Sequence, residues 1–340
     1  MKQKKTILSI LFLAVLMFAT YTVLAQCGKE LDFGQMLRFL QVGKPLHFAC
    51  ALVCMCLFVV LEGVSLRRIN QKLGWDTGFG PNLIYSAADV YYSAITPSAA
   101  GGQPASGYYM VRDGIPLSAA TSSLMLNIVC YTASLDIIGV AAMATNFPLF
   151  LRMDWPIQLL ILLGIGIQFV LLIFFLLCMF KSDLVLGMSR GVIRFLGKLH
   201  LVRDPAAKEE KIHHTVEQYA QCVSLMAGSR RLFLEVLALN LAQRVVQMLI
   251  TCFVCTAVPT GLNFGQVLAR QAFCLTGSNS IPLPGSVGAF EYLYIGIFGL
   301  DIYPDALLPS MMTARGISYY LCFVICGVMT WLYHIRTGKR

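Results

Sequence analysis

The chain has 340 residues, of which 57% are hydrophobic and 13% are charged, and its mean hydropathy is +0.71. A soluble domain carries about 25% charged residues, so this composition excludes an ordinary globular protein and predicts a polytopic membrane protein. The net charge of +9 does not indicate nucleic-acid binding, because the basic residues gather at the ends of apolar stretches and in one loop, as membrane orientation requires.

The first apolar stretch, residues 7–25, follows three lysines. This beginning resembles a signal peptide, but the stretch is longer than the ~7–15 apolar residues of that class. Because it matches the ~20 residues that cross a bilayer, we expect a retained first transmembrane helix. Apolar length predicts five further spans, at residues 46–66, 117–144, 156–180, 232–258 and 306–334.

Two other apolar segments, residues 83–112 and 264–300, are interrupted by Gly and Pro. The interruptions, TPSAAGGQPASG at 96–107 and GSNSIPLPGSVG at 277–288, each hold five Gly or Pro in twelve residues. Non-helical backbone at membrane depth persists only within protein or beside a water-filled cavity, because lipid cannot satisfy its hydrogen bonds. Broken segments in corresponding positions of two halves indicate a transport site, so we predict two re-entrant hairpins.

The basic residues predict the orientation of these segments. If both hairpins re-enter, the termini and the loop 181–231 share one side that holds 19 basic residues, against four on the other side. The positive-inside rule makes the richer side cytoplasmic, and the two hairpins then enter from opposite faces. Eight full crossings would place the basic loop outside, which the rule disfavours.

We therefore expect an all-α protein with six spans and two inverted hairpins. Residues 1–340 form one domain, with a first half at 1–180, a connector at 181–231 and a second half at 232–340. Within the connector, basic residues recur every four positions over 184–201, which predicts an amphipathic helix on the membrane surface.

Ionisable residues within apolar segments are costly and are usually paired or functional. The candidates are Glu62, Asp89, Arg112, Asp136, Arg244, Arg270, Glu291 and Arg315. Glu62 lies near the end of its span, and we interpret it as mainly structural. Glu291 directly follows the second hairpin, so we expect it to pair with Arg270 or Arg315. A phospholipid phosphate is the alternative partner for either arginine.

No catalytic motif stands out. The sequence lacks GxSxG, HExxH, P-loop and GxGxxG patterns, and no set of its cysteines and histidines stands out as a zinc site. We expect no catalytic residues, no cofactor and no metal site.

The broken motifs resemble those of the lysylphosphatidylglycerol synthase transmembrane family, the flippase-like part of multiple peptide resistance factors. The matching stretches are DVYYSAITPSAAGGQPASGYYMVRDG at 89–114, IPLPGSVGAFEY at 281–292 and RGISYY at 315–320. Ser286 stands where a second glycine of the later motif is common.

The resemblance implies movement of a phospholipid, such as lysylphosphatidylglycerol, between the leaflets of a bacterial inner membrane. Bifunctional relatives carry a soluble aminoacyltransferase domain after the membrane part, and this chain stops at Arg340, so we expect a stand-alone member. The alternatives are a membrane component of a lysyltransferase or glycolipid transferase system, and a scaffold that docks a separate synthase through residues 181–231. We expect the substrate path to include Asp89, Thr96, Pro97, Gly101, Gly102, Arg112, Arg270, Pro284, Gly285, Gly288, Glu291 and Arg315.

Overall fold

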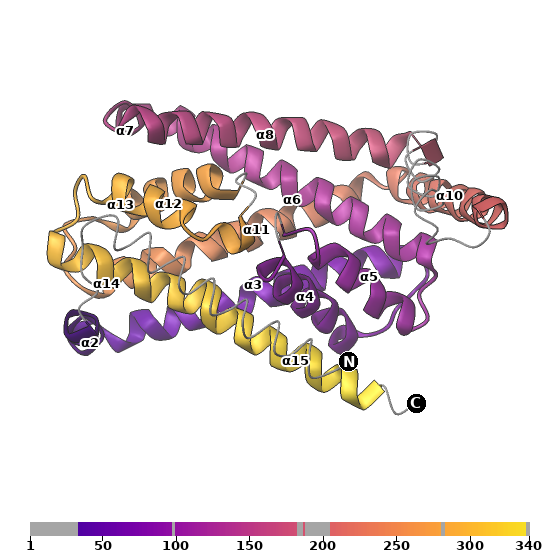
Figure 1. Cartoon of the computed structure of the whole chain (residues 1–340), viewed down its shortest axis with the longest axis horizontal. Coiled ribbons are helices and arrows are strands. Elements are labelled where there is room, and N and C mark those ends of the chain that lie inside the picture. Colours follow the sequence, from indigo (N-terminus) through magenta and orange to yellow (C-terminus); the bar gives the residue numbers. More distant parts are fainter. Residues whose placement is uncertain (1–32, 97–98, 182–185, 188–204, 280–282, 338–340) are drawn as a thin grey trace.

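The computed structural model describes residues 33–96, 99–181, 186–187, 205–279 and 283–337 (Figure 1). The regular elements of these residues are all helical. They are α2 (Phe33–Val42), α3 (Pro45–Lys72), α4 (Phe79–Ala94), α5 (Gly102–Arg112), α6 (Leu117–Thr145), α7 (Phe147–Leu151), α8 (Trp155–Phe180), α10 (Pro205–Ala227), α11 (Arg230–Ala257), α12 (Phe264–Asn279), η2 (Pro284–Ser286), α13 (Ala289–Phe298), α14 (Pro304–Arg315), η3 (Gly316–Leu321) and α15 (Cys322–Thr337). The predicted span 7–25 and most of the predicted surface helix 184–201 lie outside the described residues.

Five described helices are long and apolar enough to cross a membrane. They are α3, α6, α8, α11 and the composite helix Pro304–Thr337, and they coincide with the five predicted spans after the first. The last of these is not a uniform α-helix, because the six-residue π-helix η3 joins α14 to α15. The structure thus confirms a polytopic, all-helical membrane protein in the part of the chain that it describes.

Both broken segments form helical hairpins. Hairpin 1 consists of α4 and α5, and hairpin 2 consists of α12 and α13, with η2 near its tip. The two arms of each hairpin pack on each other. The arms have 10 to 16 residues, fewer than the ~20 that cross a bilayer, so no single arm is long enough to be a span.

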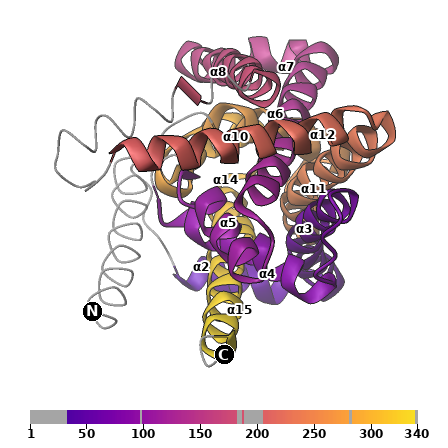
Figure 2. The same ribbon diagram turned by 90° about the vertical axis from the view of Figure 1, so that its right-hand side faces the viewer.

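The hairpins enter the helical bundle from opposite ends (Figure 1). At one end, here called the α2 end, the Lys44 N–H donates to the Ala257 carbonyl at 3.0 Å, and hairpin 2 begins and finishes. At the other, the α10 end, Ser118 of α6 donates to Gln218 of α10, and hairpin 1 begins and finishes. Figure 2 shows α10 lying across this end. The inverted arrangement expected from the sequence is therefore present in the bundle.

Helices from the two halves of the chain pack between one another and do not form two separate layers. Helix α3 from the first half packs along α11 from the second, hairpin 1 packs on α15, and hairpin 2 packs on α8 and α6. The largest apolar core accordingly draws on both halves, with Phe273, Tyr294 and Phe298 fully buried in it. Each hairpin therefore packs on helices from both halves of the chain.

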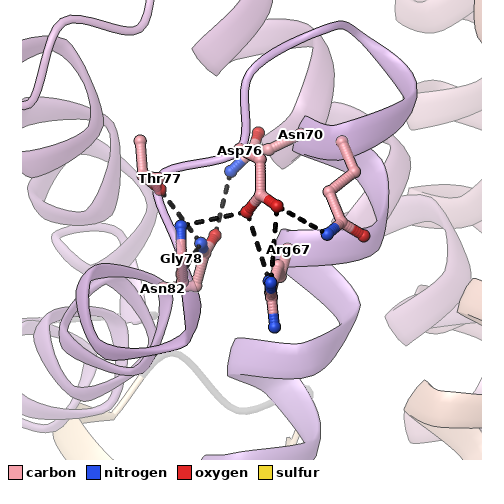
Figure 3. A network of polar contacts seen from close by, with 7 residues as sticks. Arg67, Asn70, Asp76, Thr77, Gly78 and Asn82 are labelled. Atoms are coloured by element: carbon pink, nitrogen blue, oxygen red, sulfur yellow. Dashed lines mark hydrogen bonds and ion pairs between the residues drawn. The ribbon is translucent and has the colours of Figure 1, made fainter.

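A polar network fixes the loop that leads into hairpin 1 (Figure 3). The Asp76 carboxylate accepts hydrogen bonds from Arg67 at 3.3 Å, from Gln71 at 2.9 Å and from the Gly78 N–H at 3.0 Å. Asn82 of α4 donates to the Gly78 carbonyl at 2.6 Å and accepts from Asn70 of α3 at 3.0 Å. The loop is thereby tied to the helices on both of its sides.

Acidification is expected to loosen this loop. The hydrogen bonds from Arg67, Gln71 and Gly78 lower the pKa of Asp76 from 3.8 to about 2. Because the pKa is lower in the folded protein, the stabilisation is complete above the ordinary value and is lost as the pH falls toward about 2. For the protein in detergent, the hydrogen-exchange rate of the Gly78 amide, corrected for the intrinsic pH dependence of exchange, should increase as the pH falls over that range. Asp76→Asn should remove the pH dependence; an unchanged profile in the variant would contradict this assignment.

Candidate functional site

The tip of hairpin 1 is closed by two glycines and a threonine from the first broken motif. The Thr96 hydroxyl donates to the Tyr92 carbonyl at 2.7 Å and accepts from the Gly101 N–H at 2.8 Å. Gly102 opens α5 directly against α4, where an added Cβ would overlap the Asp89 carboxylate and the Ser93 hydroxyl. A residue without a side chain is therefore required for this close approach.

The tip of hairpin 2 is organised by a buried ion pair. Arg315 of α14 donates through Nε to the Glu291 carboxylate at 2.9 Å and through its Nη2 to the Gly285 carbonyl at 3.0 Å. The other oxygen of Glu291 accepts from the Gly288 N–H at 2.6 Å, in the first turn of α13. Glu291 is 1% exposed. The expected pairing of Glu291 is confirmed, and its partner is Arg315.

The two tips meet at Tyr319, in the π-helix η3. Its hydroxyl donates to the carbonyl of Ala94, at the end of α4, at 3.1 Å. Gly285 lies against the same ring: its φ of +58° favours glycine, and an added Cβ would overlap the ring. The Arg315 guanidinium carbon lies over the same ring, 4.7 Å from its centroid. One aromatic side chain thus contacts both hairpins, in a π-helical turn of the kind that often marks functional sites.

A charged cluster lies beside hairpin 1, formed by Glu62 of α3, Asp89 of α4 and Arg244 of α11. Glu62 accepts from Ser86 at 3.2 Å and from Gln243 at 3.1 Å. Asp89 accepts from Gln103 of α5 at 2.9 Å and from Ser93 at 3.2 Å. The carboxyl groups of Glu62 and Asp89 are within hydrogen-bonding reach of each other, and Arg244 attracts both.

Arg244 connects this cluster to hairpin 2. Its guanidinium lies between the rings of Phe58 and Tyr131, 4.8 and 4.6 Å from their centroids. The Tyr131 hydroxyl donates to Asn279, at the end of α12, at 3.2 Å. The cluster is therefore in contact with both hairpins through short chains of side chains.

Not all predicted path residues lie at the tips. Arg112 is at the α10 end, where it contacts the ring and carbonyl of His334 at 3.0 and 3.3 Å. Arg270 is at the α2 end and forms an ion pair with Asp301, which also binds Arg152 at 2.9 Å. Burial raises the pKa of Asp301, but hydrogen bonds from the two arginines outweigh it and lower the pKa overall. These pairs hold the bases of the hairpins.

The two remaining path residues are prolines. Pro97 lies outside the described residues, and Pro284 belongs to η2. The structure therefore brings together Asp89, Thr96, Gly101 and Gly102 at one tip and Gly285, Gly288, Glu291 and Arg315 at the other. Whether they line a substrate path stays a prediction.

Sequence reasoning did not place Arg244 and Glu62 in the site. Both residues stand out in the sequence as charges inside apolar spans. The sequence does not show which neighbouring helix the side chain of each residue faces. The structure turns Glu62 toward α4 and α11, where it is 7% exposed. Within the described ranges, no group of three or more His, Cys, Asp or Glu side chains is arranged to hold a metal ion.

Comparison with known proteins identifies the family. The model of the lysylphosphatidylglycerol synthase TM region matches residues 6–326, which include both hairpins and the charged cluster. No curated protein matches the chain significantly. The chain therefore belongs to the lysylphosphatidylglycerol synthase TM family, a membrane region associated with lysylphosphatidylglycerol synthesis, as its broken motifs indicated.

Proposed function

From membership in this family, we propose that the protein moves a phospholipid, such as lysylphosphatidylglycerol or a related aminoacyl lipid, between the two leaflets. The family connects the chain to the membrane side of aminoacyl-lipid metabolism. The observation that carries the proposal is the meeting of two oppositely directed hairpins at Tyr319, next to buried charged groups.

This arrangement suits a substrate that must pass a polar headgroup through an apolar layer. Broken helices from opposite faces are a recurrent way to place binding groups near the midplane, and small movements of one hairpin against the other expose them to alternate sides. Between the tips, Tyr319 holds the Ala94 carbonyl with one hydrogen bond and contacts Gly285. Breaking that hydrogen bond frees one carbonyl, a small cost compared with moving a whole span.

The test is lipid movement in vesicles that contain this protein alone. Fluorescent phosphatidylglycerol in the inner leaflet should become accessible to an impermeant quencher faster than in protein-free vesicles. Gly102→Leu protein, inserted to the same amount, is the matched control. Equal rates in the wild-type, variant and empty vesicles would contradict transport and favour a scaffold or an enzyme subunit.

We place the protein in a bacterial cytoplasmic membrane, with the α10 end and both termini in the cytoplasm. The 19-to-4 distribution of basic residues supports this orientation. A single cysteine at Lys208, in a cysteine-free background, should resist an impermeant thiol reagent in intact cells and react after permeabilisation. A cysteine at Asp154, in the loop before α8, should show the reverse pattern. Labelling of position 208 in intact cells would overturn the orientation.

A further inference from the structure

The charged cluster contains two acids and one arginine, and among the described residues no other Asp, Glu, Lys or Arg is in electrostatic contact with it. Glu62 faces Ser86 and Gln243, and Asp89 faces Ser93 and Gln103. The other titratable groups in electrostatic contact with the cluster are Tyr131 of α6, beside Arg244, and Cys326 of α15, near Glu62. Glu62 and Arg244 are 7% and 5% exposed, and Asp89 is partly exposed.

The two carboxyl groups act as a pair. Ser86, which donates to Glu62, lies one turn before Asp89 on the same face of α4, so the two carboxyl groups are close together. A carboxylate has only acceptor oxygens, so a hydrogen bond between them requires one proton. The singly protonated pair carries one negative charge, which balances the one positive charge of Arg244. The buried cluster is then electrically neutral.

Arg244 retains unused hydrogen-bonding capacity. A guanidinium has five N–H donors, and here Nη1 donates to Gln247 at 2.9 Å while the buried Nε has no partner among the described residues. The rings of Phe58 and Tyr131 contact the guanidinium but offer it no oxygen or nitrogen acceptor through their faces, so its Nε can still donate to an anion. Arg270 and Arg315, in contrast, each form an ion pair with a carboxylate.

We infer, building on the proposed function, that Arg244 binds the phosphate of the lipid. The Glu62–Asp89 pair takes up one proton together with it whenever the rest of the headgroup brings no positive charge of its own, as in phosphatidylglycerol. An anion at Arg244 alone would leave the cluster with a net buried negative charge, which is costly at membrane depth. One added proton makes both carboxyl groups neutral and restores the balance. The partly exposed Asp89 gives the proton a route into the pair.

The experiment measures binding and proton uptake by the full chain in detergent. The probes are short-chain phosphatidylglycerol and dimethyl phosphate, a monoanion that distinguishes a headgroup site from a site for free phosphate esters. In weakly buffered solution, binding of either probe should take up about one proton from the solution per bound anion. The affinity of the protein for the probe should rise about tenfold for each unit by which the pH falls, between about pH 8 and pH 6. Uptake with only the lipid assigns the site to the headgroup, and uptake with both shows that the phosphate ester suffices.

Variants separate the two parts of the site. Arg244→Met should lose binding, whereas Arg231→Gln, on the exposed surface of the same helix, should bind and take up protons as the wild type does. The double variant Glu62→Gln/Asp89→Asn should bind the anion at least as tightly but without proton uptake or pH dependence. Size-exclusion profiles control for folding, and the wild-type measurement does not depend on any variant.

Binding without proton uptake, or unchanged binding by folded Arg244→Met, would overturn the inference. Neither outcome would affect transport in vesicles, which tests the proposed function separately. Conversely, proton-linked binding without lipid movement would support the anion site and contradict the proposed transport function.

Discussion

Glu291→Gln is expected to lower the free energy of unfolding by about 3–5 kcal/mol, the cost of breaking a buried ion pair from one side. The change leaves the Arg315 guanidinium, which is 9% exposed in its side chain, without its carboxylate. It also weakens the acceptor for the Gly288 N–H at the start of α13. Thermal or denaturant unfolding of the protein in detergent measures the effect.

A matched control is the exposed pair on α11. Glu235 accepts from Arg231 at 2.8 Å, but the two side chains are 39% and 90% exposed, and such pairs contribute roughly 0.3–0.5 kcal/mol. Glu235→Gln should therefore hardly change stability. The double variant Glu291→Gln/Arg315→Met should be more stable than Glu291→Gln alone, because no charge remains unpaired. Equal effects of Glu291→Gln and Glu235→Gln would show that the buried pair does not hold the tip.

Gly102→Leu is expected to reduce lipid movement per folded molecule by at least about tenfold. Its Cβ would overlap Asp89 and Ser93, so α5 must shift away from α4, and overpacking of this kind costs about 1–3 kcal/mol. The shift also displaces Gln103, which donates to Asp89 in the charged cluster. Transport in vesicles, normalised to protein that elutes as a single species in size exclusion, measures the loss.

Gly80→Leu, on the same hairpin, is the control for this change. No heavy atom lies within 4 Å of the position where its Cβ would be, so the substitution should leave transport and elution close to those of the wild type. Normal transport by folded Gly102→Leu would show that hairpin 1 does not need its close approach to move lipid. The charged cluster would then not belong to the path.

Much of the architecture can be predicted from local sequence. Crossing a bilayer requires a certain length of apolar residues, which is a property of one segment, and the helices α3, α6, α8 and α11 begin and end close to the predicted bounds. The Gly- and Pro-rich interruptions likewise predict breaks in helices, because those residues either tolerate or enforce non-helical backbone. The opposed entry of the hairpins followed from counting basic residues on the two sides.

The site depends on properties that no single segment carries. The partner of a buried side chain is decided by how neighbouring helices pack. Asn240, Gln243, Arg244 and Gln247 recur at helical spacing and mark one face of α11, but this spacing does not show which helix that face meets. Arg244, Glu62 and Asp89 come from three helices, and only the packing of α3 along α11 and of α4 on α3 brings them together. The same packing selects Arg315 over Arg270 as the partner of Glu291, since Arg270 is drawn to Asp301 at the α2 end. The sequence by itself therefore determined the five described spans, the two breaks and their entry from opposite ends. The tertiary structure decided which buried charges meet, because that depends on the rotation of each helix about its own axis.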